Sequence, residues 1–223
     1  RRTDKLSELE SKIQSNGGEV FSQKLDVTQK EDCNSFVDQV MKKWDSVDIL
    51  VNNAGVAWGA PLEEFPEVGW DKVFDTNVKG VFFLTQKLLP LLEANATKAD
   101  PARIINIGSI DGIRTPMFDT HSYGPSKAAL HTLTTQMAAK LVKRNIIANA
   151  IAPGPFPTYM LSASIGTGGD VEGTDWDALG RGNPRKRVGT PQDIAGLAIF
   201  LSSRAGAFTV GEVIKCDGGQ ANS

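Results

Sequence analysis

The stretch Val47-Asp48-Ile49-Leu50-Val51, followed directly by Asn52-Asn53-Ala54-Gly55, decides the fold class. The first part is a short apolar run, and the second is a set of small and polar residues typical of a turn. A run of this length and composition predicts a strand that is buried on both faces. Strands of this kind are typical of parallel sheets that are covered by helices.

The same alternation of strand and helix patterns continues on both sides of this stretch. Apolar runs predict further strands over residues 20–27, 103–108, 146–151 and 213–216. Periodic apolar positions predict helices over residues 5–13, 30–44, 68–92 (in two segments), 123–142 and 191–201. This order predicts βαβ units, and therefore one α/β domain over residues 1–223. We expect a doubly wound, Rossmann-like parallel sheet with helices on both faces. The glycine-rich residues 158–187 predict a substrate loop or lid, or small helices.

Composition excludes several classes of function. The chain has 223 residues, 40% hydrophobic and 22% charged, which is typical of a globular protein. Its 24 basic and 26 acidic residues give a net charge of −2, so we expect neither a nucleic-acid partner nor a membrane surface. Cys33 and Cys216 lie far apart without neighbouring histidines, which argues against a disulfide framework or a metal site. We therefore expect a reducing, cytoplasmic location.

Small or polar residues stand at the end of each predicted strand. They are Asp26-Val27, Asn52 to Gly55, Gly108-Ser109 and Pro153-Gly154. Ligands of open parallel sheets bind beyond the carboxyl ends of the strands. Each group alone is also consistent with an ordinary turn, but their joint occurrence predicts a ligand site along this edge.

Tyr123 and Lys127 form the sharpest local pattern. On a helix, residues four apart share one face, so the phenol and the ammonium lie near each other. A nearby ammonium is expected to lower the tyrosine pKa from about 10, which prepares a general acid or base. A solvated helix face is the alternative. Pro125 suits only the first turn of a helix, which places Tyr123 near a loop. Ser109, after a strand, could hold a substrate oxygen.

Taken together, these motifs resemble the short-chain dehydrogenase/reductase family. The matching residues are Asn52 to Gly55, Asn77, Ser109, Tyr123-x-x-x-Lys127, Pro153-Gly154 with Thr158, and Asp217-Gly218-Gly219. The resemblance extends from residue 1 to the C-terminus and is strongest to reductases of the 3-oxoacyl-carrier-protein type. It implies an NADP-dependent enzyme that reduces a ketone to a secondary alcohol. A sugar or polyol dehydrogenase of the same family, or a non-catalytic member that has lost its cofactor, remains an alternative.

The resemblance also implies roles for four catalytic residues. Tyr123 would exchange a proton with the substrate oxygen, and Ser109 would hydrogen-bond that oxygen. Lys127 would lower the pKa of the phenol and bind the ribose hydroxyls of the nicotinamide half. Asn77 would hold a water that links Lys127 to solvent.

Further residues are assigned to the cofactor and the substrate by the same resemblance. The expected cofactor contacts are Arg1, Arg2, Asp26, Val27, Asn53, Ala54, Gly55, Tyr123, Lys127, Pro153, Gly154 and Thr158. The expected substrate contacts are Ser109, Asp111, His121, Phe156 and Tyr159. Arg1 and Arg2 would bind the 2′-phosphate, which favours NADP over NAD, although a solvated basic terminus is equally open. His121 is also consistent with an ordinary loop histidine. The pocket is mostly apolar and suits a small ketone or alcohol, including an acyl thioester.

One element of the family pattern does not occur in this sequence. The glycine-rich phosphate loop is expected upstream of Arg1, and Gly166-Thr167-Gly168-Gly169 follows no predicted strand. We therefore expect the first βαβ portion to be missing from this chain. Either the chain is part of a longer protein, which we favour, or it is a short form that no longer binds the cofactor normally. The resemblance further implies a homo-oligomer, a dimer or a tetramer, formed through helix 79–92 and the Tyr123 helix.

Overall fold

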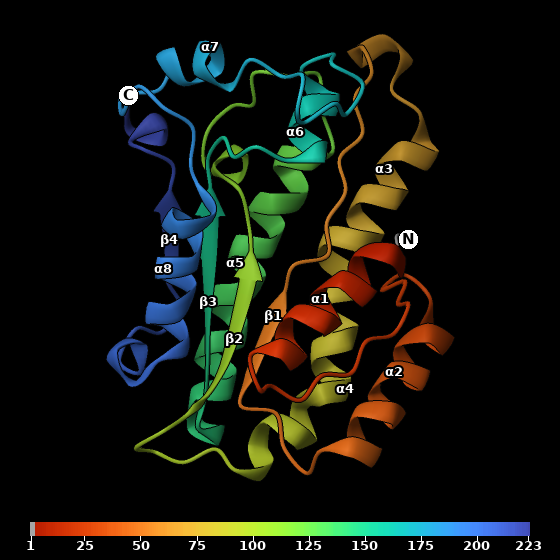
Figure 1. Cartoon of the computed structure of the whole chain (residues 1–223), viewed down its shortest axis with the longest axis vertical. Coiled ribbons are helices and arrows are strands. Elements are labelled where there is room, and N and C mark those ends of the chain that lie inside the picture. Colours follow the sequence, from red (N-terminus) through yellow and green to blue (C-terminus); the bar gives the residue numbers. More distant parts are fainter. Residues whose placement is uncertain (1–2) are drawn as a thin grey trace.

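A four-stranded parallel sheet forms the centre of the computed structural model, which describes residues 3–223 and their side chains from residue 5 (Figure 1). The spatial order of the strands follows their order in the chain: β1 Ile49–Asn52, β2 Ala102–Ile107, β3 Ile146–Pro153 and β4 Val213–Cys216. All three neighbouring pairs are parallel. Arg1 and Arg2, predicted to bind a 2′-phosphate, lie outside the described residues.

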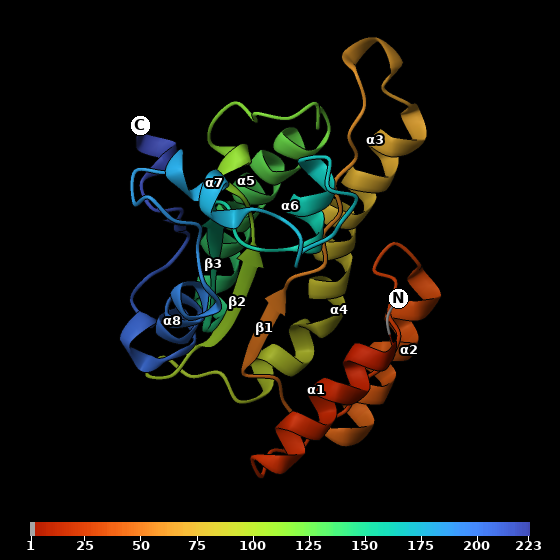
Figure 2. The same cartoon turned by 45° about the horizontal axis from the view of Figure 1, so that its top comes forward.

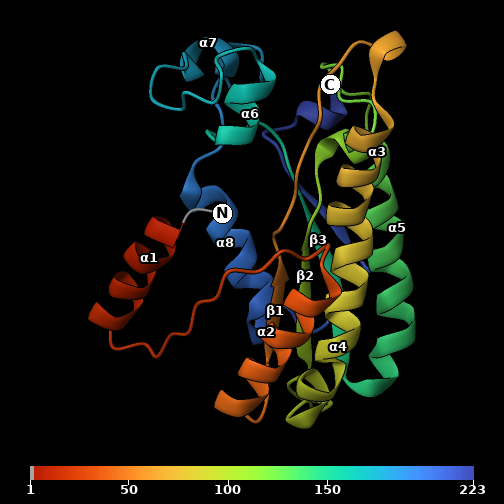
Figure 3. The same cartoon turned by 90° about the vertical axis from the view of Figure 1, so that its right-hand side faces the viewer.

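Helices cover both faces of this sheet. The α-helices of the described chain are α1 Thr3–Ser15, α2 Lys30–Lys43, α3 Glu67–Phe74, α4 Val81–Ala94, α5 Tyr123–Leu141, α6 Tyr159–Ser164, α7 Trp176–Arg181 and α8 Pro191–Ser202. Helices α4 and α5 pack on one face and α8 on the other (Figure 3). Short 3-10 helices span Leu62–Glu64, Ile110–Gly112, Val142–Arg144, Arg204–Gly206 and Gln220–Asn222. The predicted doubly wound fold is confirmed.

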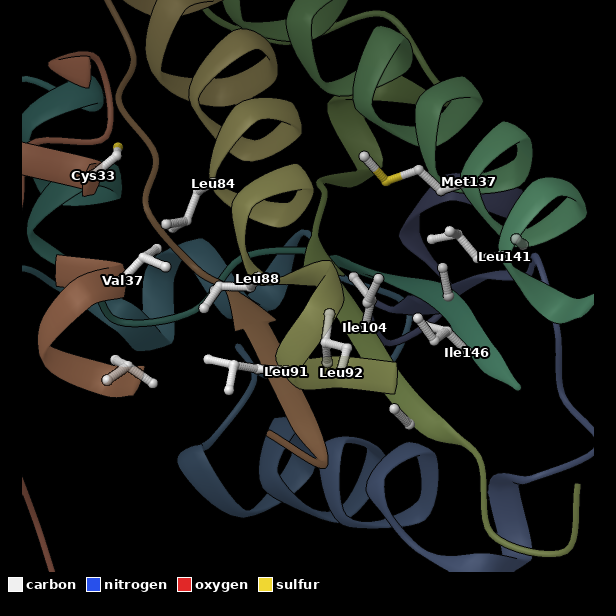
Figure 4. Close-up of a cluster of buried hydrophobic side chains, with 14 residues drawn as sticks. Cys33, Val37, Leu84, Leu88, Leu91, Leu92, Ile104, Met137, Leu141 and Ile146 are labelled. Atoms are coloured by element: carbon white, nitrogen blue, oxygen red, sulfur yellow. The ribbon is translucent and has the colours of Figure 1, made fainter. Parts of the chain in front are cut away.

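Strand β2 shows why neighbouring residues of a central strand are both apolar. Successive side chains of a strand point to opposite faces of the sheet. Ile104 belongs to the cluster formed with α2, α4 and α5, whereas Ile105 packs with Leu201 of α8 (Figure 4 shows the first cluster). Both isoleucines are almost fully buried. Apolar residues are therefore required at both odd and even positions.

A chain of buried polar side chains ties β1 and β2 to their helices. Asn52 at the end of β1 donates to Thr85 of α4 at 3.0 Å and to Asn106 of β2 at 2.8 Å. Asn106 in turn donates to Thr134 of α5 at 2.8 Å. Buried amides are costly to leave unpaired, so this chain fixes the relative positions of both strands and both helices.

Residues 67–94 form one helical rod rather than two helices. Its central turn, Asp75–Gly80, is a π-helix that continues α3 directly into α4. A π turn holds one more residue than an α turn, which changes the face that the following residues present. The fully buried Asn77 belongs to this turn.

The prediction of a strand over residues 20–27 is wrong. This segment is extended, but it pairs with no strand of the described chain, and β1 pairs only with β2. An apolar run becomes a strand only where a neighbour accepts its backbone hydrogen bonds. Exposed Ile49 and Val51 lie in β1, the first strand in the order of the sheet.

The segment 158–187 contains two short helices, which agrees with the expectation of small helices. Helices α6 and α7 lie beyond the carboxyl ends of the strands, above the strand arrowheads in Figure 2. Gly166, Gly168 and Gly169 between them have φ of 86°, 65° and 87°, which is turn conformation rather than a strand entering a helix. Across the described residues, no helix is sufficiently long and apolar to cross a membrane.

The packing of α4 leads to a prediction of stability. We expect Leu92→Ala to lower the free energy of unfolding by about 2–5 kcal/mol, because it leaves a cavity in the main cluster. Urea unfolding measures the loss. Leu62→Ala makes the same chemical change at a side chain that is 68% exposed, and should cost less than about 0.5 kcal/mol. Equal losses in the two variants would contradict this description of the core.

Candidate active site

Tyr123 and Ser109 meet at the edge where β2 ends and α5 begins. Ser109 caps the 3-10 helix Ile110–Gly112, and its Oγ accepts the backbone N–H of Asp111 at 3.1 Å. The Ser109 side chain is also the hydrogen-bonding neighbour that lowers the pKa of the Tyr123 phenol. The two groups that were predicted to face a substrate oxygen are therefore neighbours.

Burial keeps the phenol of Tyr123 protonated. The pKa of Tyr123 is raised to about 12, mainly by burial; the Ser109 side chain lowers it in part, and the Asp111 carboxylate raises it. We expected Lys127 to lower this pKa, but the structure differs. The Lys127 Nζ lies 5.6 Å from the ring centre and donates to the Ile107 carbonyl at 2.8 Å. The Tyr123 phenol thus keeps its proton throughout the neutral range.

Lys127 places an ammonium in the interior beside this phenol. The residue is only 4% exposed, and its desolvation lowers the pKa to about 8. An ammonium has three donors, and within the described part of the chain one acceptor, the Ile107 carbonyl, bonds to it. A Cβ on Gly55 would lie 3.4 Å from Nζ and 3.6 Å from Asn77 Oδ1. Gly55 therefore leaves this side of the ammonium uncovered, which fits the ribose hydroxyls of a dinucleotide.

Asn77 fastens the loop after β1 to α5. Its Oδ1 accepts the Val56 N–H at 2.9 Å, and its Nδ2 donates to the Val56 carbonyl and to Ser126 Oγ, both at 3.0 Å. Both amide hydrogens and the carbonyl oxygen are thus engaged. The geometry gives Asn77 a positioning role, and the water relay expected from the family resemblance stays a prediction.

The residues predicted for the adenine half lie along the neighbouring edge. Asp26 Oδ1 accepts the N–H and Oγ1 of Thr28 in the turn before α2. A Cβ on Gly80 of the π turn would come within 2.8 Å of Val27, so this turn packs closely on that segment. Asn53 and Ala54 are exposed after β1. Their contacts with a cofactor stay predictions.

Pro153, Gly154 and Thr158 follow the end of β3. The Gly154 N–H donates to the Cys216 carbonyl at 3.0 Å, and a Cβ on Gly154 would lie 2.8 Å from the Asp217 backbone. Glycine is thus required here by the close approach of the chain after β4. Thr158 caps α6 by accepting the Leu161 N–H at 3.2 Å. Nothing in these contacts opposes the predicted nicotinamide contacts.

The predicted substrate residues fall into two groups. Asp111 adjoins Ser109 and Tyr123, and its burial raises the pKa of the carboxyl. His121 packs edge-on against Phe65, with ring centres 5.6 Å apart.

Phe156 and Tyr159 lie elsewhere. Phe156 packs on Gly189 and lines a cavity of about 520 Å³ at the ends of β3 and β4, whose lining does not include Ser109 or Tyr123. Tyr159 covers Gly169. The structure therefore brings Asp111 to the Ser109–Tyr123 pair and does not bring Phe156 there.

The sequence analysis missed two residues at this edge. Ser126 Oγ donates to the Tyr123 carbonyl at 2.7 Å and accepts from Asn77. His131 Nε2 accepts the Ser109 N–H at 3.4 Å. Tyr123, Lys127 and His131 are spaced four residues apart along α5, and this spacing could have indicated that His131 lies on the same helix face. No group of potential metal ligands occurs among the residues that the structure describes.

Comparison with known proteins decides the family. Residues 1–221 match the family model described as enoyl-(acyl carrier protein) reductase. The chain is 34% identical over 97% of its length to a 3-oxoacyl-[acyl-carrier-protein] reductase of Thermotoga maritima, covering 83% of that protein. This chain belongs to the short-chain dehydrogenase/reductase family. The predicted resemblance is confirmed.

The names of two further relatives state two different reactions. The rhamnolipids-biosynthesis 3-oxoacyl-[acyl-carrier-protein] reductase of Pseudomonas aeruginosa is 47% identical over 173 residues, which cover 78% of this chain and 66% of that protein. The chain thus spans about two thirds of the length of this relative. A gluconate 5-dehydrogenase of Gluconobacter oxydans is 33% identical, with 98% of this chain and 82% of that protein covered.

Two similar solved structures are NADP complexes. The Pseudomonas aeruginosa RhlG/NADP complex has a TM-score of 0.81 and 41% identity, and covers 88% of this chain and 75% of its own. A gluconate 5-dehydrogenase from Burkholderia cenocepacia with NADP and tartrate has a TM-score of 0.86 and 29% identity. The match covers 100% of this chain and 84% of that one.

The contacts of Asn77 lead to a second prediction. Asn77→Ala removes all three hydrogen bonds and leaves buried partners unpaired, so we expect a loss of roughly 1–3 kcal/mol in the free energy of unfolding. Asn95→Ala removes a single exposed hydrogen bond to Ser46 and is the matched control. Chemical denaturation compares the two, and a loss no larger than that of the control would contradict the positioning role.

Proposed function

We propose that this protein is an NADP-dependent reductase that converts a ketone into a secondary alcohol, with Tyr123 as the proton donor. One observation carries the proposal. A largely desolvated phenol that keeps its proton at neutral pH neighbours a serine hydroxyl, and a buried ammonium lies 5.6 Å from the centre of its ring.

The residues present fit a nicotinamide dinucleotide. The Lys127 ammonium keeps donors beyond the one that Ile107 accepts, and Gly55 adds no side chain in front of it. When bound, NADPH would supply the hydride. Similar structures that contain NADP support this form of the cofactor.

The protein's own groups would then handle the oxygen and the proton. Ser109 Oγ would donate a hydrogen bond to the ketone oxygen and hold it beside the Tyr123 hydroxyl. As negative charge develops on that oxygen, the O–H bond of Tyr123 breaks and its proton forms the new alcohol O–H. The phenolate that remains lies near the Lys127 ammonium, which stabilises its charge. A pKa raised by burial keeps the phenol ready for this direction of the reaction.

We favour a 3-oxoacyl substrate, including an acyl thioester, because the relative with 47% identity carries that name. A sugar acid or polyol is the second candidate. The gluconate 5-dehydrogenases support it, as do the Asp111 carboxylate and the Arg114 guanidinium, which lie 3.8 Å apart next to Ser109 and suit a hydroxylated substrate. Loss of NADPH absorbance with acetoacetyl thioester, compared with 5-ketogluconate, separates these candidates. Failure of the full-length protein to bind NADPH by calorimetry would instead support a non-catalytic protein.

The surface formed by α4 and α5 supports a homo-oligomer. Phe82 and Phe83 are partly exposed and pack edge-on, with ring centres 5.2 Å apart. They border an apolar hollow of about 360 Å³ together with Phe74, Val78 and Leu133. Exposed apolar surface of this kind is typical of a protein contact. We also propose a cytoplasmic location, which is consistent with the free thiols of Cys33 and Cys216.

Removal of the phenolic oxygen tests the proton donor. We expect Tyr123→Phe to lower kcat about 10²–10⁴-fold, because no other group replaces the proton that is transferred. NADPH binding, followed by fluorescence, and the unfolding midpoint should stay close to those of the unmodified protein. Tyr159→Phe makes the same change at an exposed tyrosine and controls for it. Turnover within a few-fold of normal in Tyr123→Phe would refute the role.

The buried ammonium predicts a pH dependence. The pKa of Lys127, about 8, lies below its ordinary value, so the ammonium is present below pH 8 and is lost as the pH rises through it. We expect kcat/KM for NADPH in the reduction direction to fall above about pH 8, while Tyr123 stays protonated. Lys127→Arg keeps its charge and should give a lower but flat profile. A flat profile to about pH 10 in the unmodified protein would count against this assignment.

The apolar surface predicts an effect on assembly. Phe83→Glu places a charge on the α4–α5 surface, and we expect light scattering to report a smaller particle than the unmodified protein. Leu62→Glu, a similar change on the short helix before α3, should leave the particle size unchanged. An unmodified protein that is already monomeric would overturn the proposed oligomer.

A further inference from the structure

We propose that His131 positions Ser109 for the reaction by accepting its backbone N–H at Nε2, as a neutral imidazole with its hydrogen on Nδ1. The effect on turnover rests on the proposed function, whereas the state of the imidazole can be tested without it.

Ser109 stands at the first position beyond the sheet. The Gly108 N–H still donates to the Ile151 carbonyl of β3, at 2.7 Å. The next N–H, that of Ser109, has His131 Nε2 at 3.4 Å as its acceptor. The backbone of Ser109 is held extended, with φ −165° and ψ 153°, and its Oγ contacts Asp111 and Tyr123. His131 therefore holds the residue whose hydroxyl reaches the proton donor.

Two glycines leave room for the imidazole ring of His131. A Cβ on Gly108 would overlap His131 Nε2. A Cβ on Gly112 would lie 2.9 Å from His131 Cε1 and closer still, at 2.6 Å, to the Ala128 backbone nitrogen of α5. Real Cβ atoms do not approach other atoms so closely. The segment from Gly108 to Gly112 thus wraps the ring, and a shift of the ring would move Ser109 as well.

Burial and one neighbouring charge favour the neutral imidazole. Lys127 lies one turn earlier on α5, and on the facing segment Ser109 donates its N–H to the ring, with the partly buried Asp111 two residues further along the chain. Burial and the Lys127 ammonium lower the pKa of His131 to about 4. Since the folded pKa lies below the ordinary value, the ring is neutral above about pH 4 and keeps the lone pair that accepts the Ser109 N–H.

Histidine nitrogen NMR tests the proposed state directly. The chain has 2 histidines, so the spectrum of His131→Gln identifies the resonances of His131 by their loss. We expect the spectrum to show Nδ1 protonated and Nε2 unprotonated, with no titration between about pH 5 and 8. An Nε2–H tautomer, or titration within that range, would overturn the proposal whether or not the protein reduces ketones.

Kinetics then test the positioning role. We expect His131→Leu, which removes the acceptor, to lower kcat at least about 10-fold with unchanged affinity for NADPH, whereas His131→Gln, which can present an oxygen near the Nε2 position, should recover most of it. In the alcohol-oxidation direction, the pH midpoint of kcat should rise in His131→Leu, because the Ser109 hydrogen bond that lowers the pKa of Tyr123 is weakened. Asp111 and Lys127, the other charged groups near Tyr123, are unchanged in this variant.

Met137→Leu, a buried change on the same helix, controls for packing and should leave kcat within about 2-fold. Normal kcat and pH midpoint in His131→Leu, or equal impairment of His131→Gln and His131→Leu, would overturn the positioning role. An unmodified protein that reduces no ketone would end the proposed function but leave the NMR result standing.

Discussion

The hydrogen-bonded chain Asn52–Asn106–Thr134 is the constraint on which the site depends. It crosses from β1 through β2 to α5 in the interior, where an unpaired amide would be costly. Ser109 follows Asn106 at the end of β2, and Lys127 precedes Thr134 by about two turns of α5. Because the chain fixes the strand against the helix, it also fixes the serine hydroxyl against the phenol and the ammonium.

Three titratable groups follow one another at intervals of four residues on α5, and burial determines which of them carries charge. Tyr123 stays a neutral acid because burial raises its pKa, and His131 stays a neutral acceptor because burial lowers its own. Lys127 alone is charged at neutral pH, with the Ile107 carbonyl as its acceptor. One positive charge in a largely desolvated edge acts strongly on any negative charge that develops there.

The order and spacing of apolar residues within single segments correctly predicted most helices and strands. The apolar runs of β2 and β3 and the Tyr123–Lys127 spacing indicated the strands, α5 and the shared helix face correctly. The run over residues 20–27 looks the same in the sequence, but a strand also needs a hydrogen-bonded neighbour, and the described chain provides none. The raised pKa of Tyr123 could not be predicted either, since the spacing gives the proximity of Lys127 but not the depth of burial.

Long-range polar contacts were the least predictable. Asn52 and Asn106 each follow or interrupt an apolar run and read as ordinary strand residues, yet they face each other in register. His131 requires Gly108 and Gly112 on the far side of its ring, which lie about twenty residues earlier in the chain. Such partnerships depend on how β2 and α5 meet, and no single window of the sequence contains both members.

The π turn Asp75–Gly80 changes the direction of the α4 side chains relative to those of α3 within one continuous rod. An α-helix rotates by about 100° per residue, so deletion of one residue from this turn would rotate the second half by that angle relative to the first. Leu88 and Leu92 would then leave the interior, and the side chains of Phe82 and Phe83 would point in another direction. Asn77 could keep its position. The extra residue therefore sets the direction in which the α4 side chains point relative to those of α3. One continuous rod can thus place Asn77 at the candidate site and Phe82 and Phe83 on the outer surface.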